Sequence, residues 1–179
     1  MQYRRAFIPG GTYFFTVVTL DRKPIFLDAS AIGVLRKSFR AVQTKRPFQM
    51  DAIVLLPEHL HCLWTLPPGD SDYSTRWRLI KTWFTRHCHR GPMPNPDESQ
   101  LRRGEQRIWQ TRFWEHLIRD DRDFRHHIDY IHFNPVKHDL VTTVSEWPHS
   151  SFHRYVREGV LPENWADGGI DLPPDIGRE

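Results

Sequence analysis

Cysteine is scarce in this chain, and long hydrophobic runs are missing. Only two cysteines occur among 179 residues. Two thiols are too few for a disulfide framework or a thiolate zinc site, and such scarcity is typical of a reducing compartment. The N-terminal residues lead into no long apolar run, so we expect neither a signal peptide nor a membrane span. These absences predict a cytoplasmic protein that has no membrane partner.

The chain also lacks an internal repeat and a second hydrophobic domain. Its length and its 39% hydrophobic content suit one domain with a single core. We assign residues 1–158 to that domain, with a flexible loop at about 91–104, because that stretch has no apolar periodicity. Residues 159–179 are expected to form an acidic, loosely ordered C-terminal tail.

Positive charge is concentrated in the body of the chain. The net charge is +3 overall, but acids gather near the C-terminus, so that residues 1–157 hold 24 bases against 16 acids. A body this basic favours a polyanionic partner, although charge alone also fits simple solubility. Seven tryptophans and eleven phenylalanines can fill a core, and they also supply flat faces on which unpaired bases stack.

Hydrophobic periodicity predicts four strands and three main helices. The break between the second and third strands is so short that it requires an antiparallel hairpin. We therefore predict an α+β fold of the ferredoxin-like, split βαβ kind, with a central antiparallel sheet and a C-terminal helix. In chain order the elements are a strand at 12–20, a helix at 28–46, strands at 49–56 and 59–66, a helix at 75–89, a strand at 113–119, and helices at 120–133 and 150–158.

The second and third helices carry expectations about single residues. In the second, a buried stripe through Trp77 and Phe84 leaves Arg76 for solvent or phosphate. The third begins with acids, which suit a helix N-terminus. It is expected to break at Asn134, because a residue that precedes proline avoids the α region.

Two histidines enter the strand at 59–66 with one residue between them. Side chains i and i+2 of a strand point to the same face, so His59 and His61 leave the sheet together, beside Leu63. The opposite face takes an unbroken apolar set that belongs to the core. Paired imidazoles make half of a divalent-metal site, whereas the alternative is two exposed histidines at a strand mouth.

Tyr130 and Asn134 lie four residues apart near the end of the third helix. That spacing places both on one helical face. If the helix packs beside His59 and His61, the amide oxygen of Asn134 can be a third ligand for Mg²⁺ or Mn²⁺, and the phenolate of Tyr130 can attack a phosphodiester. The alternatives are a core tyrosine and an asparagine helix cap.

Several motifs together resemble a known family. The sequence is similar to the single-tyrosine transposases with a His-hydrophobe-His metal motif, and more closely to their REP-associated branch. The resemblance spans about residues 3–165. It rests on Pro57-Glu58-His59-Leu60-His61-Cys62, on Asp129-Tyr130-Ile131-His132-Phe133-Asn134-Pro135-Val136-Lys137, on the N-terminal Tyr3-Arg4-Arg5 and Pro9-Gly10-Gly11-Thr12 stretches, on Arg112-Phe113-Trp114-Glu115-His116 and on Trp147-Pro148-His149-Ser150-Ser151-Phe152.

The resemblance implies a ferredoxin-like fold and a set of site residues. Metal ligands carry over onto His59, His61 and Asn134, and the nucleophile onto Tyr130. The implied activity is the nicking and rejoining of single-stranded DNA at repetitive extragenic palindrome (REP) hairpins, through a covalent 5′-phosphotyrosine and with Mg²⁺ or Mn²⁺. We expect a monomer, with a dimer as the alternative.

The residues that contact DNA are assigned more loosely. Arg4, Arg5 and the Gly10-Gly11 turn are candidates for reading an unpaired flank, and Arg112 and Trp114 for a phosphate clamp and a stacking face. Lys137 is a candidate for holding the scissile phosphate. His153 and Arg154 are candidates for bringing the C-terminal segment over the site. For each of these residues, the alternative is an ordinary surface cation, a plain turn or a core aromatic.

Two other functions compete with strand transfer. A histidine-triad nucleotide hydrolase needs a third alternating histidine, and position 63 is Leu63. A hairpin-binding protein without catalysis fits the same scaffold. The complete set of His59, His61, Tyr130 and Asn134 favours the enzyme.

Overall fold

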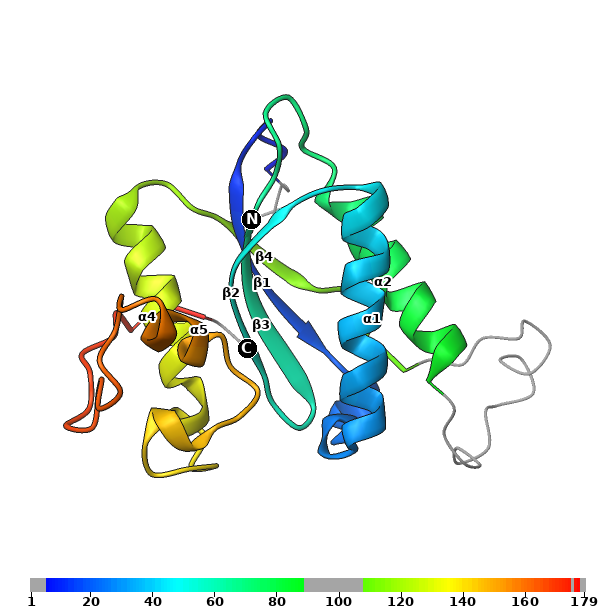
Figure 1. Cartoon of the computed structure of the whole chain (residues 1–179). Helices are drawn as coiled ribbons and strands as arrows, with labels where there is room; N and C mark the ends of the chain where they lie inside the picture. The colour runs from blue at the N-terminus through cyan, green and yellow to red at the C-terminus, as the bar shows by residue number, and fades with distance from the viewer. Residues whose placement is uncertain (1–5, 89–107, 175, 178–179) are drawn as a thin grey trace.

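The computed structural model describes residues 6–88, 108–174 and 176–177, and its centre is a four-stranded antiparallel sheet (Figure 1). The strands are β1 (Thr12–Val18), β2 (Gln49–Leu55), β3 (His59–Thr65) and β4 (Trp114–Leu117), in the spatial order β2-β3-β1-β4. This order, with helices after β1 and β3, confirms the predicted α+β, ferredoxin-like fold. The loop assigned to 91–104 lies outside the described residues.

One face of the sheet packs against α1 (Ala29–Lys45) and α2 (Tyr73–His87). The helix α1 begins where predicted, since the side chain of Asp28 accepts a hydrogen bond from the Ser30 amide. The core on this side includes the β3 residues Leu60, Cys62 and Trp64. The face assigned to the core from the alternation of β3 is therefore confirmed.

The opposite face packs against α4 (Asp121–Lys137), as Figure 1 shows on the left of the sheet. Its smaller apolar cluster contains Phe14, Leu63 and Ile131. Because α4 covers this face, His59 and His61 are 1% and 0% exposed. The alternative of two solvent-exposed histidines is therefore excluded.

The predicted break at Asn134 is wrong, because α4 continues through Pro135 to Lys137. A proline inside a helix removes one backbone hydrogen bond. The bond lost here is the one that would reach the Ile131 carbonyl, and the helix still continues, since the amide of His138 bonds to the carbonyl of Asn134 and the amide of Leu140 to that of Pro135. Asn134 therefore lies within the helix, and its side chain does not cap the helix end.

Arg76 does not face solvent, contrary to the prediction. It is 1% exposed, and its guanidinium donates to both carboxylate oxygens of Asp70, at 3.0 and 2.6 Å. Further bonds reach the carbonyls of Arg46, Pro47 and Asp72. The residue fastens the start of α2 to the end of α1.

The chain after α4 returns to the edge strand β2. Residues 149–151 pair with β2 through bonds from Leu55 to the His149 carbonyl and from the Ser151 amide to the Ile53 carbonyl. The short helix α5 (Phe152–Arg157) follows. Beyond it, Leu172 and Ile176 pack against the cluster under α4.

None of the helices described is long and apolar enough to cross a membrane.

Candidate active site

The histidine pair is oriented by hydrogen bonds from both sides. The Nδ1 atom of His59 lies 2.9 Å from Oε1 of Glu58, and Nδ1 of His61 lies 2.9 Å from the hydroxyl of Thr16. The two ring centroids are 4.8 Å apart. Since both Nδ1 atoms are engaged, Nε2 is the atom that each ring offers for ligation, and a carboxylate or hydroxyl behind it fixes the ring.

The helix α4 and the residue directly after it place three side chains along these rings. The ring centroid of Tyr130 lies 5.2 Å from that of His61, and the centroid of His138 lies 5.4 Å from that of His59. Asn134 stands midway between Tyr130 and His138, four residues from each. Positions four apart share a helical face, so Asn134 faces the same histidine pair.

The side-chain amide of Asn134 is suited to bind a metal ion. It is fully buried, and within the described part of the chain neither its oxygen nor its nitrogen has a hydrogen-bond partner. A buried amide without partners costs free energy, which an ion at its oxygen would offset. Two imidazole nitrogens and one amide oxygen are a donor set suited to a divalent cation.

Tyr130 is held at its hydroxyl by two groups. The hydroxyl donates to the carbonyl of Gly177 at 2.9 Å, and the ammonium of Lys137 donates to the hydroxyl at 3.2 Å. The C-terminal stretch thus covers the phenol, which is 1% exposed. A Cβ added at Gly177 would overlap the Tyr130 ring, so only glycine allows this approach.

A second group that can hold a metal lies at the start of α4. It consists of His116 on β4 and of Asp123 and His127 on α4, with ligand atoms within 4.8 Å of one another. Nε2 of His116 is 2.8 Å from one oxygen of Asp123, and Nδ1 of His127 is 3.1 Å from the other. Burial lowers the pKa of His127 to about 4, so this imidazole is neutral at pH 7.

The predicted DNA contacts do not all gather at this site. Thr12 pairs with Thr65 while Val18 pairs with His59, so the far end of β1 lies about 20 Å from His59 at 3.4 Å per residue, and Gly10 and Gly11 lie beyond that end. Gly10 has a φ of 72° and bonds to the Asp70 carbonyl, as a tight turn requires.

Trp114 lies on the sheet face that carries His61. Both residues pair with Thr16, from opposite sides of β1, so the indole stands about 10 Å away across two strand spacings. It is half-buried and packs edge-on against Phe14, with centroids 5.8 Å apart. Arg112, two residues earlier, is exposed.

His153 and Arg154 lie on α5 and bind nearby backbone. Nε2 of His153 is 2.8 Å from the Trp147 carbonyl, and the guanidinium of Arg154 donates to the carbonyls of Met50 and Asp51 on β2. Neither residue contacts Tyr130 or the histidine pair in any recorded bond. Arg4 and Arg5 lie outside the described residues.

The sequence analysis missed several residues around Tyr130. Glu58 and His138 both contact His59, and Gly177 covers the phenol. Glu58 lies directly before His59 in sequence, so its position was a usable signal. Gly177 is 47 residues from Tyr130, and no local pattern marks such a contact.

Comparisons with known proteins identify the family of the chain. No protein-family model matches the chain. The chain is 48% identical over 171 residues to the REP-associated tyrosine transposase of Escherichia coli (strain K12), covering 96% of this chain and 94% of that protein. It is 45% identical to a putative REP-associated tyrosine transposase of Haemophilus influenzae, covering 95% of each.

A solved structure of a REP-associated tyrosine transposase bound to a REP hairpin is similar throughout. Its TM-score to this chain is 0.83 at 45% identity, and the match covers 100% of this chain and 98% of that one. Identity at this level over nearly the whole length is far above what a shared fold alone requires. The chain belongs to the REP-associated tyrosine transposases.

Proposed function

We propose that this chain is a metal-dependent endonuclease and strand transferase that nicks and rejoins single-stranded DNA at REP hairpins. The observation that carries the proposal is the position of the Tyr130 ring, 5.2 Å from that of His61, with the unpartnered Asn134 amide one turn further along the same helix. The family membership supplies the class of substrate, since a relative binds a REP hairpin.

The proposed chemistry is a transesterification at phosphorus. The phenolate oxygen of Tyr130 forms a bond to the scissile phosphorus, and the bond from phosphorus to the 3′ oxygen breaks. The 3′ oxygen leaves as a hydroxyl after taking up a proton, and the 5′-phosphate stays on the tyrosine. Because one phosphodiester replaces another, the reverse attack by a 3′-hydroxyl rejoins the strand without an energy source.

Other residues of this chain would bind the cation and stabilise the phenolate. A divalent cation held by His59, His61 and Asn134, Mg²⁺ or Mn²⁺ in our proposal, would polarise the phosphodiester and neutralise charge on its oxygens. Lys137 stands 3.2 Å from the phenol oxygen, where an ammonium favours the phenolate. The ordinary pKa of a tyrosine, about 10, makes such help necessary at pH 7.

A labelled single-stranded hairpin incubated with Mg²⁺ or Mn²⁺ tests the proposal. Denaturing gels should show a protein–DNA adduct that disappears with chelator and in Tyr130→Phe. Tyr155→Phe is the matched control, since it removes a phenol that bonds to Asp51 on the edge strand. Normal cleavage by Tyr130→Phe would refute the nucleophile assignment, and efficient cutting of duplex DNA would contradict the single-strand preference.

The alternative function is hairpin binding without catalysis. The contact of Gly177 with the Tyr130 hydroxyl favours it, because that contact covers the nucleophile. A wild-type protein that binds hairpins but forms no adduct with either metal would establish this alternative.

A further inference from the structure

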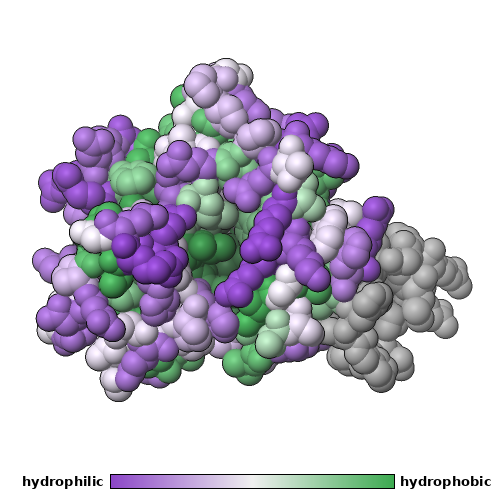
Figure 2. Space-filling view, in the orientation of Figure 1, coloured by the Kyte–Doolittle hydropathy of each residue, from purple (hydrophilic) through white to green (hydrophobic). Residues whose placement is uncertain are grey.

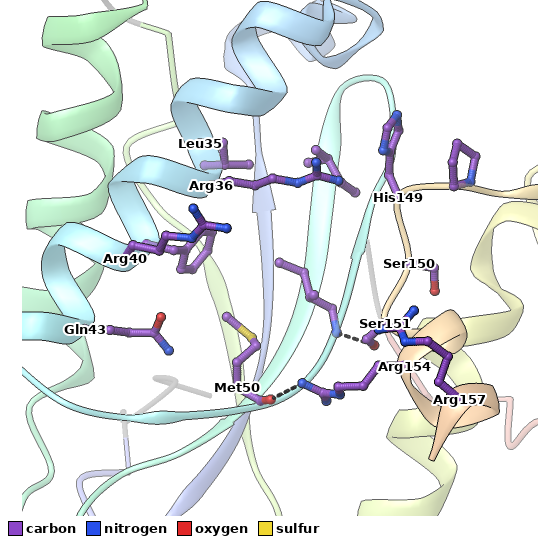
Figure 3. A pocket seen from close by; sticks show the side chains of 14 residues that line it. Leu35, Arg36, Arg40, Gln43, Met50, His149, Ser150, Ser151, Arg154 and Arg157 are labelled. Atoms are coloured by element: carbon purple, nitrogen blue, oxygen red, sulfur yellow. Dashed lines mark hydrogen bonds between the residues drawn. The ribbon is translucent and has the colours of Figure 1, made fainter. Parts of the chain in front are cut away.

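A cavity of about 550 Å³ lies between α1, the edge strand β2 and the segment that leads into α5 (Figure 3). Figure 2 shows it as a hollow with a hydrophobic floor between hydrophilic ridges. Its volume is within the range of about 300–1,000 Å³ that is typical of small-molecule sites. The floor is formed by Leu35, Phe39, Met50 and Ile53.

This cavity is separate from the candidate active site. Its floor residues pack with the core beneath α1 and α2, whereas His61 faces α4 on the other side of the sheet, where Tyr130 lies. The two sites therefore share the sheet but not a surface. Nothing assigned so far to catalysis explains the cavity.

The walls of the cavity are strongly cationic. Four of the described residues that line it are arginines, and none is acidic. Arg36 and Arg40 are exposed on α1, and in Figure 3 their guanidinium groups extend toward the hollow. On the facing wall, Arg154 bonds to the carbonyls of Met50 and Asp51, so its position is fixed by β2.

One polar atom on the wall has no partner. Nδ1 of His149 is buried, and no hydrogen bond to it occurs in the part of the chain that the structure describes. Burial and the positive charge of Arg36 lower the pKa of this histidine, so the imidazole is neutral and can accept or donate one hydrogen bond.

We propose that this cavity binds an unpaired nucleotide of the DNA substrate, with the base on the apolar floor and its flanking phosphates between Arg36 and Arg40. The proposal rests on the proposed function for the nature of the ligand. An apolar floor suits a flat aromatic base, which duplex DNA does not offer because its bases are stacked and paired. Arginine is the side chain best suited to phosphate.

The cavity would thus hold single-stranded DNA on the side of the sheet away from Tyr130. Aromatic or apolar contact with a base combined with cationic contact to the backbone is the usual basis of single-strand binding. One cavity of this volume takes one nucleotide, so the site would fix the position of the strand rather than read a long sequence.

Fluorescence anisotropy with an unstructured 12-nucleotide DNA of mixed sequence is the first test. Arg36→Ala/Arg40→Ala should weaken binding about tenfold and lower the salt slope by about 1.4, at 0.7 per lost phosphate contact. Lys37→Ala/Lys45→Ala is the matched control, because it removes two exposed cations from the same helix outside the cavity. Equal affinity of the arginine variant and wild type would overturn the proposal.

Two further measurements separate base binding from charge alone. An abasic strand of the same length should bind wild type more weakly than the DNA, and the arginine variant should lose that difference. DNA carrying 5-iodouracil should crosslink to Phe39, Met50 or His149 under ultraviolet light. Crosslinks that map only elsewhere, or no preference over the abasic strand, would refute a nucleotide site and leave the cavity to a protein segment or to none.

The outcome of these binding and crosslinking tests is independent of the nuclease assay. If wild type forms no adduct but the cavity crosslinks to DNA, the proposed chemistry fails and the nucleotide site stands. If the adduct forms and the arginine variant binds normally, the nucleotide site fails alone.

Discussion

The contact between Gly177 and Tyr130 predicts that the C-terminal stretch limits the reactivity of the phenol. In Gly177→Ala, the new Cβ would overlap the Tyr130 ring, so the stretch must lift away. The variant then loses the bond from the Tyr130 hydroxyl to the Gly177 carbonyl. A hydrogen bond contributes about 1 kcal/mol net, which corresponds to about a fivefold larger population of the open form.

Two rates report this population. The rate at which tetranitromethane nitrates Tyr130, followed by mass spectrometry, should rise about fivefold and does not depend on the proposed chemistry. The rate of adduct formation should rise with it if opening precedes cleavage. Deletion of residues 173–179 should give at least the same increase, because it also removes the packing of Ile176.

Gly169→Ala is the control for backbone strain. Gly169 also has a positive φ, of 83°, but a Cβ there would meet no atom within 4 Å. The variant therefore shares the cost of a left-handed alanine without the overlap with Tyr130. If both variants react like wild type, the Gly177 contact does not limit access. If Gly169→Ala is equally fast, general loosening of the stretch explains the effect.

Three further predictions test the metal ligands and the core. His61→Ala should slow adduct formation about a hundredfold or more, whereas His116→Ala should not; the reverse result would place the essential cation in the second group. Asp70→Asn should lower the free energy of unfolding, measured in urea, by about 2 kcal/mol. This loss is smaller than the loss expected for a fully buried ion pair, because three carbonyls still bind Arg76. An unchanged free energy of unfolding would contradict the role given to the pair of Arg76 and Asp70. Burial lowers the pKa of His132 to about 3, so the unfolded chain binds its proton more readily. The contribution of His132 to stability is complete above about pH 6.5 and falls by about 2 kcal/mol at pH 5. In urea titrations the loss between these two pH values should be smaller by that amount in His132→Asn than in wild type, while the share of His127 remains.

The predicted strands and helices were largely confirmed, because the spacing of apolar residues and the steric preferences of the backbone decide them locally. The alternation of β3 separates His59 and His61 from Cys62 and Trp64, and the structure places these two sets on opposite faces. The same argument predicted that Tyr130 and Asn134 share a helix face. It could not establish that this helix covers the histidines, which the structure shows through the contact of the Tyr130 and His61 rings.

The errors arose where tertiary partners outweigh local preference. Arg76 resembles a solvated cation in sequence, but Asp70 and three carbonyls around it make burial favourable. The position of Pro135 resembles a helix end, yet proline removes only its own N–H, and the amides of His138 and Leu140 still bond to the carbonyls of Asn134 and Pro135. Both cases depend on hydrogen-bond partners that the spacing of apolar residues in the sequence does not reveal.

The segment 149–152 connects the two sites that the sheet separates. Its Ser151 hydroxyl accepts a hydrogen bond from the Ile53 amide, beside the cavity floor, and lies 3.0 Å from Nε2 of His132 on α4. His132 is two residues after Tyr130 on the same helix. A strand seated against Arg36 and His149 would therefore press on a segment that is bonded to the helix carrying the proposed nucleophile. Because these buried hydrogen bonds couple the cavity wall to α4, the proposed nuclease would have the fixed relation between cavity and phenol that it needs if the position of its cut is to depend on where an unpaired strand is held.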